Sequence, residues 1–147
     1  MTGIERVLLT LWVGGLWITG YLVAPTLFSS LEDRHLAGQL AGQIFQTMNY
    51  VGLGAGSYLF VSTLIVSDNQ RLREWRLWVL AAMILLVAVA AFSLQPMMQE
   101  LKVQGIAEGS EQASRFARLH GLSSSLFLLN SVLGLLLVGT GLRRKIG

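Results

Sequence analysis

The chain contains no cysteine, only two prolines and few charged residues. The absence of cysteine excludes disulfides, thiolate metal sites, iron–sulfur clusters and cysteine nucleophiles. Charged residues make up 13% of the chain, whereas soluble domains carry about 25%. Because hydrophobic residues make up 53% and stand in long blocks, the composition indicates a single integral membrane domain, residues 1–147.

Motifs of soluble enzymes are also missing. The chain has no Gly-x-Ser-x-Gly, no P-loop and no dinucleotide fingerprint after a strand. The net charge of +3 does not indicate nucleic acid, because Lys and Arg stand at the ends of apolar blocks, where they set membrane topology. We therefore expect a protein that contacts the lipid bilayer, binds no nucleic acid and is not an enzyme.

Four apolar blocks have the length of about 20 residues that a membrane-spanning helix needs. They occupy residues 7–28, 48–66, 77–94 and 119–142. Their apolar runs are continuous and lack the alternation of strands. The fold expected is therefore all-α, a four-helix transmembrane bundle. The first block is longer than the apolar core of a signal peptide, so we expect it to be retained.

Basic residues in the flanks predict the orientation of the bundle. Seven lie in the N-terminal flank, the second loop and the C-terminal tail, against four in the first and third loops. The seven are Arg6, Arg71, Arg73, Arg76, Arg143, Arg144 and Lys145, and the four are Arg34, Lys102, Arg115 and Arg118. The positive-inside rule then places both termini in the cytoplasm. Trp75 and Trp78 fit an aromatic belt beside the second loop.

The two outward connections look helical. Pro25 is expected to end the first helix, and Pro96 to break or kink the third. Ser110 is a candidate N-cap with Glu111 in the first turn, so the fourth helix is expected to begin near Glu111. The second and fourth helices should therefore extend on the periplasmic side.

The first outward connection carries a polar stripe. His35, Gln39, Gln43 and Gln46 follow the spacing of one helix face. Such a stripe is costly against lipid, because an unpaired amide in hydrocarbon costs several kcal/mol. Two interpretations stay open: the stripe faces water in the head-group region, or it lines a water-accessible cavity inside the bundle.

The fourth helix has a polar face of its own, and both histidines lie on the outward side of the predicted topology. For Asn130 the alternative to a ligand contact is a hydrogen bond between helices, and for His120 it is an interfacial or capping role. The candidate ligand-binding residues are His35, Gln39, Gln43, Gln46, His120, Ser123 and Asn130.

Metal and haem sites are weaker alternatives. His35, His120, Met97 and Met98 would supply nitrogen and thioether ligands suited to Cu(I). One histidine on each of two helices is also the minimum for bis-His haem. No pair has metal-ligand spacing on one helix, so no cofactor is assigned.

Small residues and one proline predict where helices pack. "GLGAG" at residues 52–56 follows no strand, so its glycines are interpreted as packing positions and not as a phosphate loop. The expected packing positions are Gly14, Gly15, Pro25, Gly38, Gly42, Gly52, Gly56 and Gly134.

Three stretches together resemble a known family: "WVGGLWITGYLVAPTLFSSL", "AGQLAGQIF" and "RLHGLSSSLFLLN". The residues that carry the likeness are Trp12, Gly14, Gly15, Ala24, Pro25, Leu27, Phe28, Ala37, Gly38, Gly42, Phe45, His120, Gly121, Ser123 and Asn130. The chain is thereby similar to small bacterial proteins related to eukaryotic transmembrane protein 205. That resemblance implies a four-helix, multi-pass protein of the bacterial inner membrane and no established reaction.

A looser likeness extends to the copper-resistance protein D-like and protoporphyrinogen-oxidase-like membrane families. This chain has no histidine before His35, which argues against haem and oxidase activity. We expect a membrane protein that binds or passes a small polar or metal species at an outward-facing polar cavity. A haem- or copper-binding redox protein and a structural subunit without ligand remain the alternatives. A homodimer or another membrane protein as partner also stays open.

Overall fold

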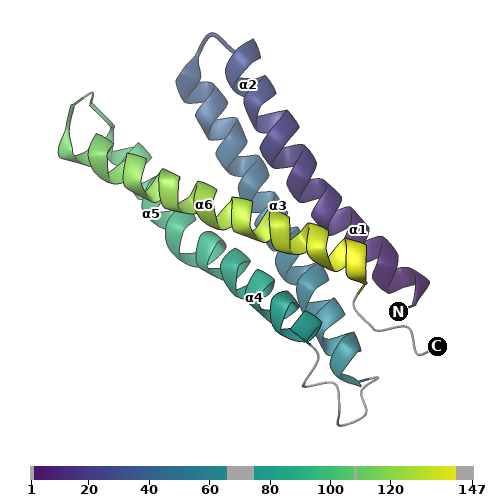
Figure 1. Cartoon of the computed structure of the whole chain (residues 1–147). Coiled ribbons are helices and arrows are strands. Elements are labelled where there is room, and N and C mark those ends of the chain that lie inside the picture. Colours follow the sequence, from purple (N-terminus) through teal and green to yellow (C-terminus); the bar gives the residue numbers. More distant parts are fainter. Residues whose placement is uncertain (1, 66–74, 108, 142–147) are drawn as a thin grey trace.

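The computed structural model describes residues 2–65, 75–107 and 109–141. Within these ranges the chain forms four helical rods and no strand. Figure 1 shows the rods side by side, each running opposite to the one before it. The all-α, four-helix prediction is confirmed.

Two rods contain a proline and continue through it. The first joins α1 (Gly3–Ile18), η1 (Thr19–Val23) and α2 (Ala24–Ser30), and the third joins α4 (Trp75–Val89), η3 (Ala90–Leu94) and α5 (Gln95–Gln104). The π-helical turns η1 and η3 end two residues before Pro25 and Pro96. A wider turn relieves the clash between a proline ring and the carbonyl four residues earlier. The prediction that Pro25 ends the first helix is therefore wrong, and Pro96 does not break the third.

The other two rods are uninterrupted helices, α3 (Arg34–Ile65) and α6 (Glu111–Thr140). Asp33 caps α3, because its Oδ1 accepts two backbone N–H groups of the first turn at 2.8 and 3.2 Å. Ser110 caps α6 as predicted, and its Oγ accepts the backbone N–H of Ala113 at 3.1 Å. The polar stripe and the second apolar block therefore belong to one helix, with a fixed rotation between them.

The apolar core lies at the end of the bundle that holds the start of α1. Trp12 is fully buried and lies against Gly52 and Gly56 of α3. A Cβ on these glycines would come within 2.6 and 3.0 Å of its ring. Residues of α4 and α6 complete this core. The buried core residues are Leu9, Trp12, Val13, Leu16, Leu59, Leu80, Met83, Val87 and Leu137.

At the opposite end the rods separate into two helical hairpins. One consists of α2 and the first half of α3, and we call it the α2–α3 arm (residues 24–49). The other consists of α5 and the first half of α6, and we call it the α5–α6 arm (residues 95–130). Figure 1 shows the two arms splayed apart, whereas the rods meet at the closed end.

Within the described residues, three rods are long and apolar enough to cross a membrane, namely Gly3–Ser30, Trp75–Gln104 and Glu111–Thr140. Glycine and polar residues dilute the apolar residues of α3, which packs between α1 and α4 in the same bundle. Large apolar side chains are exposed along the rods, for example Leu11 and Phe92 at 67% and 65%. Such exposure fits contact with lipid, so the features are those of a multi-pass membrane protein.

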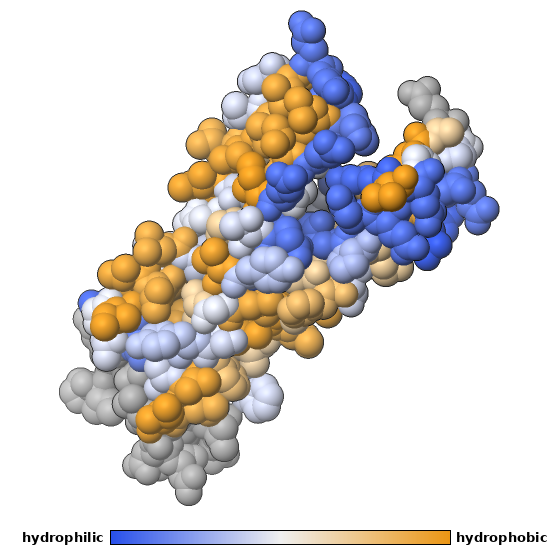
Figure 2. Space-filling model, turned by 180° about the vertical axis from the view of Figure 1, so that it is seen from behind, coloured by the Kyte–Doolittle hydropathy of each residue, from blue (hydrophilic) through white to orange (hydrophobic). Residues whose placement is uncertain are grey.

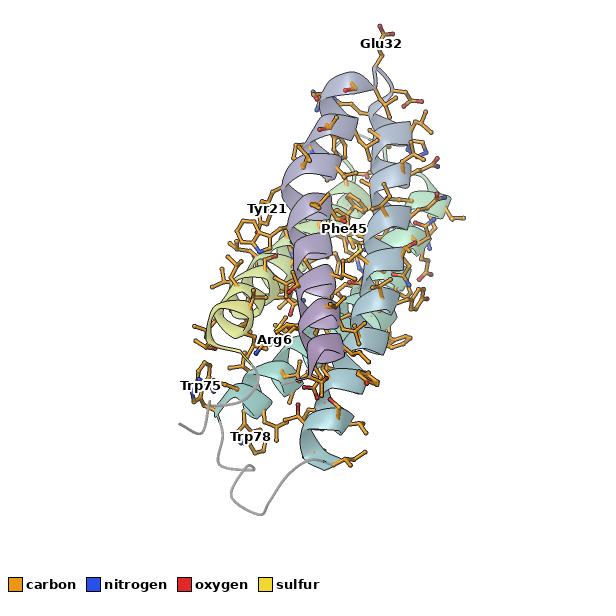
Figure 3. The ribbon with its side chains drawn as sticks, turned by 90° about the vertical axis from the view of Figure 1, so that its right-hand side faces the viewer. Arg6, Tyr21, Glu32, Phe45, Trp75 and Trp78 are labelled. Atoms are coloured by element: carbon orange, nitrogen blue, oxygen red, sulfur yellow. The ribbon has the colours of Figure 1, made fainter. Side chains whose placement is uncertain are left out.

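The predicted orientation depends largely on residues outside the described ranges. These are Arg71, Arg73, Arg143, Arg144 and Lys145, and most of the second loop lies there as well. Trp75 and Trp78 are described, and they are 44% and 64% exposed. Figure 3 shows both at the same end of the molecule as Arg6, whereas Glu32 marks the opposite end.

Candidate functional site

A cavity separates the α2–α3 arm from the α5–α6 arm, and we call it the hairpin cavity. Its volume is about 730 Å³, and all four rods contribute to its lining. It extends from Arg34 and Phe116 near the tips of the arms to Asn49 and Asn130 in the middle of the bundle. Figure 2 shows hydrophilic residues gathered on both arms, with a notch between them. The volume falls in the range of about 300–1,000 Å³ that is typical of small-molecule sites.

Two buried asparagines form the floor of the hairpin cavity. Asn49 of α3 is 8% exposed, and Asn130 of α6 is 3% exposed. Among the described residues, Oδ1 of Asn130 has no hydrogen-bond partner, so no hydrogen bond between helices accounts for this atom. An unpaired buried acceptor costs about 1–3 kcal/mol, and native structures contain few of them. The floor thus contains a buried acceptor that has no partner among the described residues.

Aromatic rings line the middle of the hairpin cavity. Phe127 of α6 packs directly on Gly20 of η1, where a Cβ would overlap the ring. The ring of Phe127 lies edge-on to Phe45 of α3, 5.1 Å between centroids, and 6.1 Å from Tyr21. Figure 3 shows Phe45 inside the bundle and Tyr21 beside α6. Gly20 in the π turn η1 therefore leaves the space that the ring of Phe127 occupies.

Lys102 of α5 reaches across the mouth of the hairpin cavity. Its Nζ donates a hydrogen bond to the carbonyl oxygen of Gly38 at 3.2 Å and lies 5.7 Å from the ring centroid of Phe116. It thus joins α3, α5 and α6. A Cβ at Gly42 would lie in ordinary van der Waals contact with Nζ, at 3.5 Å. An ammonium has three donors, so two stay available among the described residues.

Both histidines line the same cavity. Nε2 of His35 lies 3.0 Å from Nε2 of Gln39. The ring of His120 stacks on Phe116, with centroids 6.0 Å apart and an angle of 9° between the planes. Four of the seven predicted ligand-binding residues therefore meet around the hairpin cavity: His35, His120, Ser123 and Asn130.

The charge in the hairpin cavity has one sign. Arg34, His35, Lys102 and His120 line it, and no Asp or Glu does so in the part of the chain that the structure describes. Asp33, next to this group, uses its carboxylate to cap α3. A cleft lined by basic groups between apolar walls concentrates anions.

The glutamines of the stripe border a second, smaller space, which we call the glutamine groove. It lies between α3 and α5 and has a volume of about 440 Å³. Its lining consists of Gln39, Gly42, Gln43, Gln46, Gln95, Pro96 and Gln99. Gly42 and Gln95 line both spaces. The structure thus divides the predicted site in two, with the histidines in one space and the glutamines in the other.

The candidate metal ligands are only partly brought together. His35, His120 and Met98 line the hairpin cavity, whereas Met97 is 37% exposed and lies outside it. No group of three or more His, Asp or Glu side chains among the described residues could hold a metal ion.

The predicted packing glycines fall into two groups. A Cβ on Gly15, Gly52, Gly56 or Gly134 would come within 3.0 Å of a neighbouring side chain. A Cβ on Gly42 or Gly38 would meet its first neighbour only at 3.5 and 3.9 Å, and Gly14 has nothing within 4 Å. Gly38 and Gly42, together with Pro25, line the hairpin cavity, so the two glycines widen the cavity where close helix contact was expected.

Sequence reasoning missed several residues that shape the hairpin cavity: Gly20, Arg34, Phe45, Asn49, Lys102 and Phe127. A usable signal existed for Lys102, because it follows Gln95 and Met98 at the spacing of one helix face. Asn49 follows Gly42 and Phe45 in the same way. Recognising these faces as lining required knowing which way each helix is turned.

A buried carboxylate at the closed end was also missed. Glu5 is 2% exposed. It accepts hydrogen bonds from the backbone N–H of Thr2 at 2.7 Å and from Oγ of Ser62 at 3.0 Å. Because Thr2 accepts the N–H of Glu5 in return, the pair forms a capping box. Glu5 therefore fixes the start of α1 against α3, away from the hairpin cavity.

A protein family described as a domain of unknown function (DUF4149) matches residues 7–107. The match includes α3 and all but the first residues of α1, and it ends before α6. No curated protein and no solved structure matches the chain. The residues that α6 gives to the hairpin cavity therefore lie outside the matched segment.

Proposed function

The chain belongs to the DUF4149 family, whose function is unknown, and we propose that it binds a small molecule in the hairpin cavity. The observation that carries this proposal is Oδ1 of Asn130, an acceptor in a side chain only 3% exposed that lines the cavity without a partner among the described residues. A ligand donor would offset the cost of burying it. The proposed role is binding or passage of this molecule, and no reaction is assigned to the lining.

The proposal places the protein in the bacterial inner membrane, with both termini in the cytoplasm. The count of basic residues in the flanks supports this orientation, and the mouth of the cavity would then open toward the periplasm. The resemblance to proteins related to transmembrane protein 205 fits this setting and assigns no reaction.

Filling the hairpin cavity tests the proposal. Ser123 lines the cavity, whereas Ser125 is exposed on the same helix, outside the lining, and bonds to its own backbone at Gly121. Ser123→Trp should prevent the bound molecule from copurifying with the protein, because the indole ring would fill the part of the cavity that the molecule occupies. Ser125→Trp, the same change on the outer face, should retain it.

Native mass spectrometry of each variant, released from its own membranes, measures the bound mass directly. We expect an added mass on the wild type and on Ser125→Trp, and none on Ser123→Trp. An added mass that survives equally in Ser123→Trp would place the bound molecule elsewhere and refute the proposal.

A further inference from the structure

We infer that the ligand of the hairpin cavity is a single-chain amphipathic anion, with a carboxylate or phosphate head at the mouth and an apolar body below it. This inference rests on the proposed function and adds the chemical class of the ligand. It follows from three properties of the cavity: the sign of the charge at the mouth, the apolar walls, and the depth and volume of the space.

The mouth offers fixed donors to an anion. Lys102 is held in place by the carbonyl oxygen of Gly38 at 3.2 Å and by the face of Phe116 at 5.7 Å, and two of its N–H donors stay available. Arg34 and His35 line the same mouth from the other arm. Charge-assisted hydrogen bonds to a carboxylate or phosphate are about twice as strong as neutral ones.

No Asp or Glu of the described residues lines the cavity beside these basic groups. Asp33 caps the first turn of α3. Glu32 is exposed, and Figure 3 shows it at the tip of the turn, pointing away from the bundle. An anionic head group would therefore find basic partners from both arms.

The walls below the mouth suit an apolar body. Phe45, Phe127, Met98 and Leu86 line the cavity from three different rods. Burial of an apolar chain against them removes apolar surface from water and so favours binding. A small inorganic anion would leave these walls exposed to water, so the cavity fits an amphiphile better than a free phosphate ion.

The depth and volume of the cavity suit a ligand with one chain. Its lining on α3 extends from Arg34 to Asn49, which is about 22 Å at a rise of about 1.5 Å per residue. The volume of about 730 Å³ lies in the range of about 300–1,000 Å³ that is typical of sites for one small molecule. The inferred occupant is therefore one long molecule with a single chain.

The floor adds a preference at the far end of the ligand. Oδ1 of Asn130 is an acceptor without a partner among the described residues, so it favours a hydroxyl or N–H group there. A chain that carries a terminal hydroxyl group should bind more tightly than the same chain without one, because it removes an unpaired buried acceptor.

A set of ligands with the same tail tests the inference. Binding of radiolabelled hexadecanoate is measured on the full-length protein in phosphatidylcholine nanodiscs, with empty nanodiscs subtracted. Hexadecyl phosphate, ω-hydroxyhexadecanoate, hexadecanol and hexadecyltrimethylammonium are the competitors. We expect hexadecanol and the cation to need at least about a tenfold higher concentration than the two anions, and ω-hydroxyhexadecanoate to compete best.

Variants separate the head-group contact from general effects. Lys102→Gln should weaken hexadecanoate binding about tenfold, and Lys102→Arg should keep most of it because the charge stays. Arg118→Gln removes a positive charge from an exposed position of α6 outside the lining, and it should bind as the wild type does. Asn130→Leu should abolish the advantage of ω-hydroxyhexadecanoate over hexadecanoate.

The outcomes distinguish this inference from the proposed function. Equal competition by hexadecanol and hexadecyl phosphate, with loss of binding only in Ser123→Trp, would refute the anionic class and leave the cavity as the binding site. Unchanged binding in Ser123→Trp would refute the proposed function itself. Phosphatidylglycerol, added to the same competition series, has two chains, and equal competition by it would refute the single-chain class. The series on the wild type stays decisive even if Lys102→Gln fails to fold.

Discussion

At the scale of single residues, the surroundings of each glycine in α3 decide its role. Gly54 and Gly56 lie two positions apart on this helix. A Cβ on Gly54 would meet nothing within 4 Å, whereas one on Gly56 would lie 2.8 Å from Cγ1 of Ile84 and 3.0 Å from the ring of Trp12. Because Trp12 is rigid and fully buried, it has no space to move aside.

Gly56→Ala should therefore lower the free energy of unfolding by about 1–3 kcal/mol, the usual cost of overpacking a core. Gly54→Ala should leave it unchanged or raise it by about 0.5–1 kcal/mol, because alanine favours the helix over glycine. Denaturant titration in detergent micelles, followed by circular dichroism, measures both. Equal stability of Gly56→Ala and Gly54→Ala would contradict the close packing of Trp12 against α3 at Gly56.

At the scale of elements, the helices follow from local signals and the π turns do not. Continuous apolar blocks and the Ser110 cap predicted the helices, because a helix depends on neighbours within a few residues. Pro25 was expected to end the first helix, and Pro96 to break or kink the third. Both helices continue through a π turn and the proline, and the first π turn packs against another rod, as Phe127 on Gly20 shows. Such packing is not visible in a single segment.

The cap of α6 provides a prediction at this scale. Ser110→Ala removes the acceptor for the backbone N–H of Ala113. The free energy that stabilises the first turn of α6 should therefore fall by about 1 kcal/mol. Amide hydrogen exchange should show faster exchange of Ala113. Ser114→Ala, an exposed serine one turn later, should leave that exchange unchanged. Equal exchange of Ala113 in both variants would contradict the cap.

At the scale of the whole molecule, one end of the bundle is closed by Trp12 and the core, and the other opens into two arms. Sequence reasoning placed His35 and Gln43 on one stripe, which is correct for an isolated helix. The sequence could not assign these two residues to different sites. In the structure α3 borders two spaces, and His35 lines the hairpin cavity whereas Gln43 lines the glutamine groove. That separation depends on where α5 and α6 lie, which is a property of the assembled bundle.

The central claim is that the two arms enclose a ligand cavity between Lys102 and Asn130. An experimental density map of the protein in lipid nanodiscs, at side-chain resolution, tests it most directly. We predict splayed arms and an elongated non-protein density that begins beside Lys102 and ends at the amide of Asn130. Arms packed against each other, with the rings of Phe28 and Phe116 in contact and no space between them, would contradict the account.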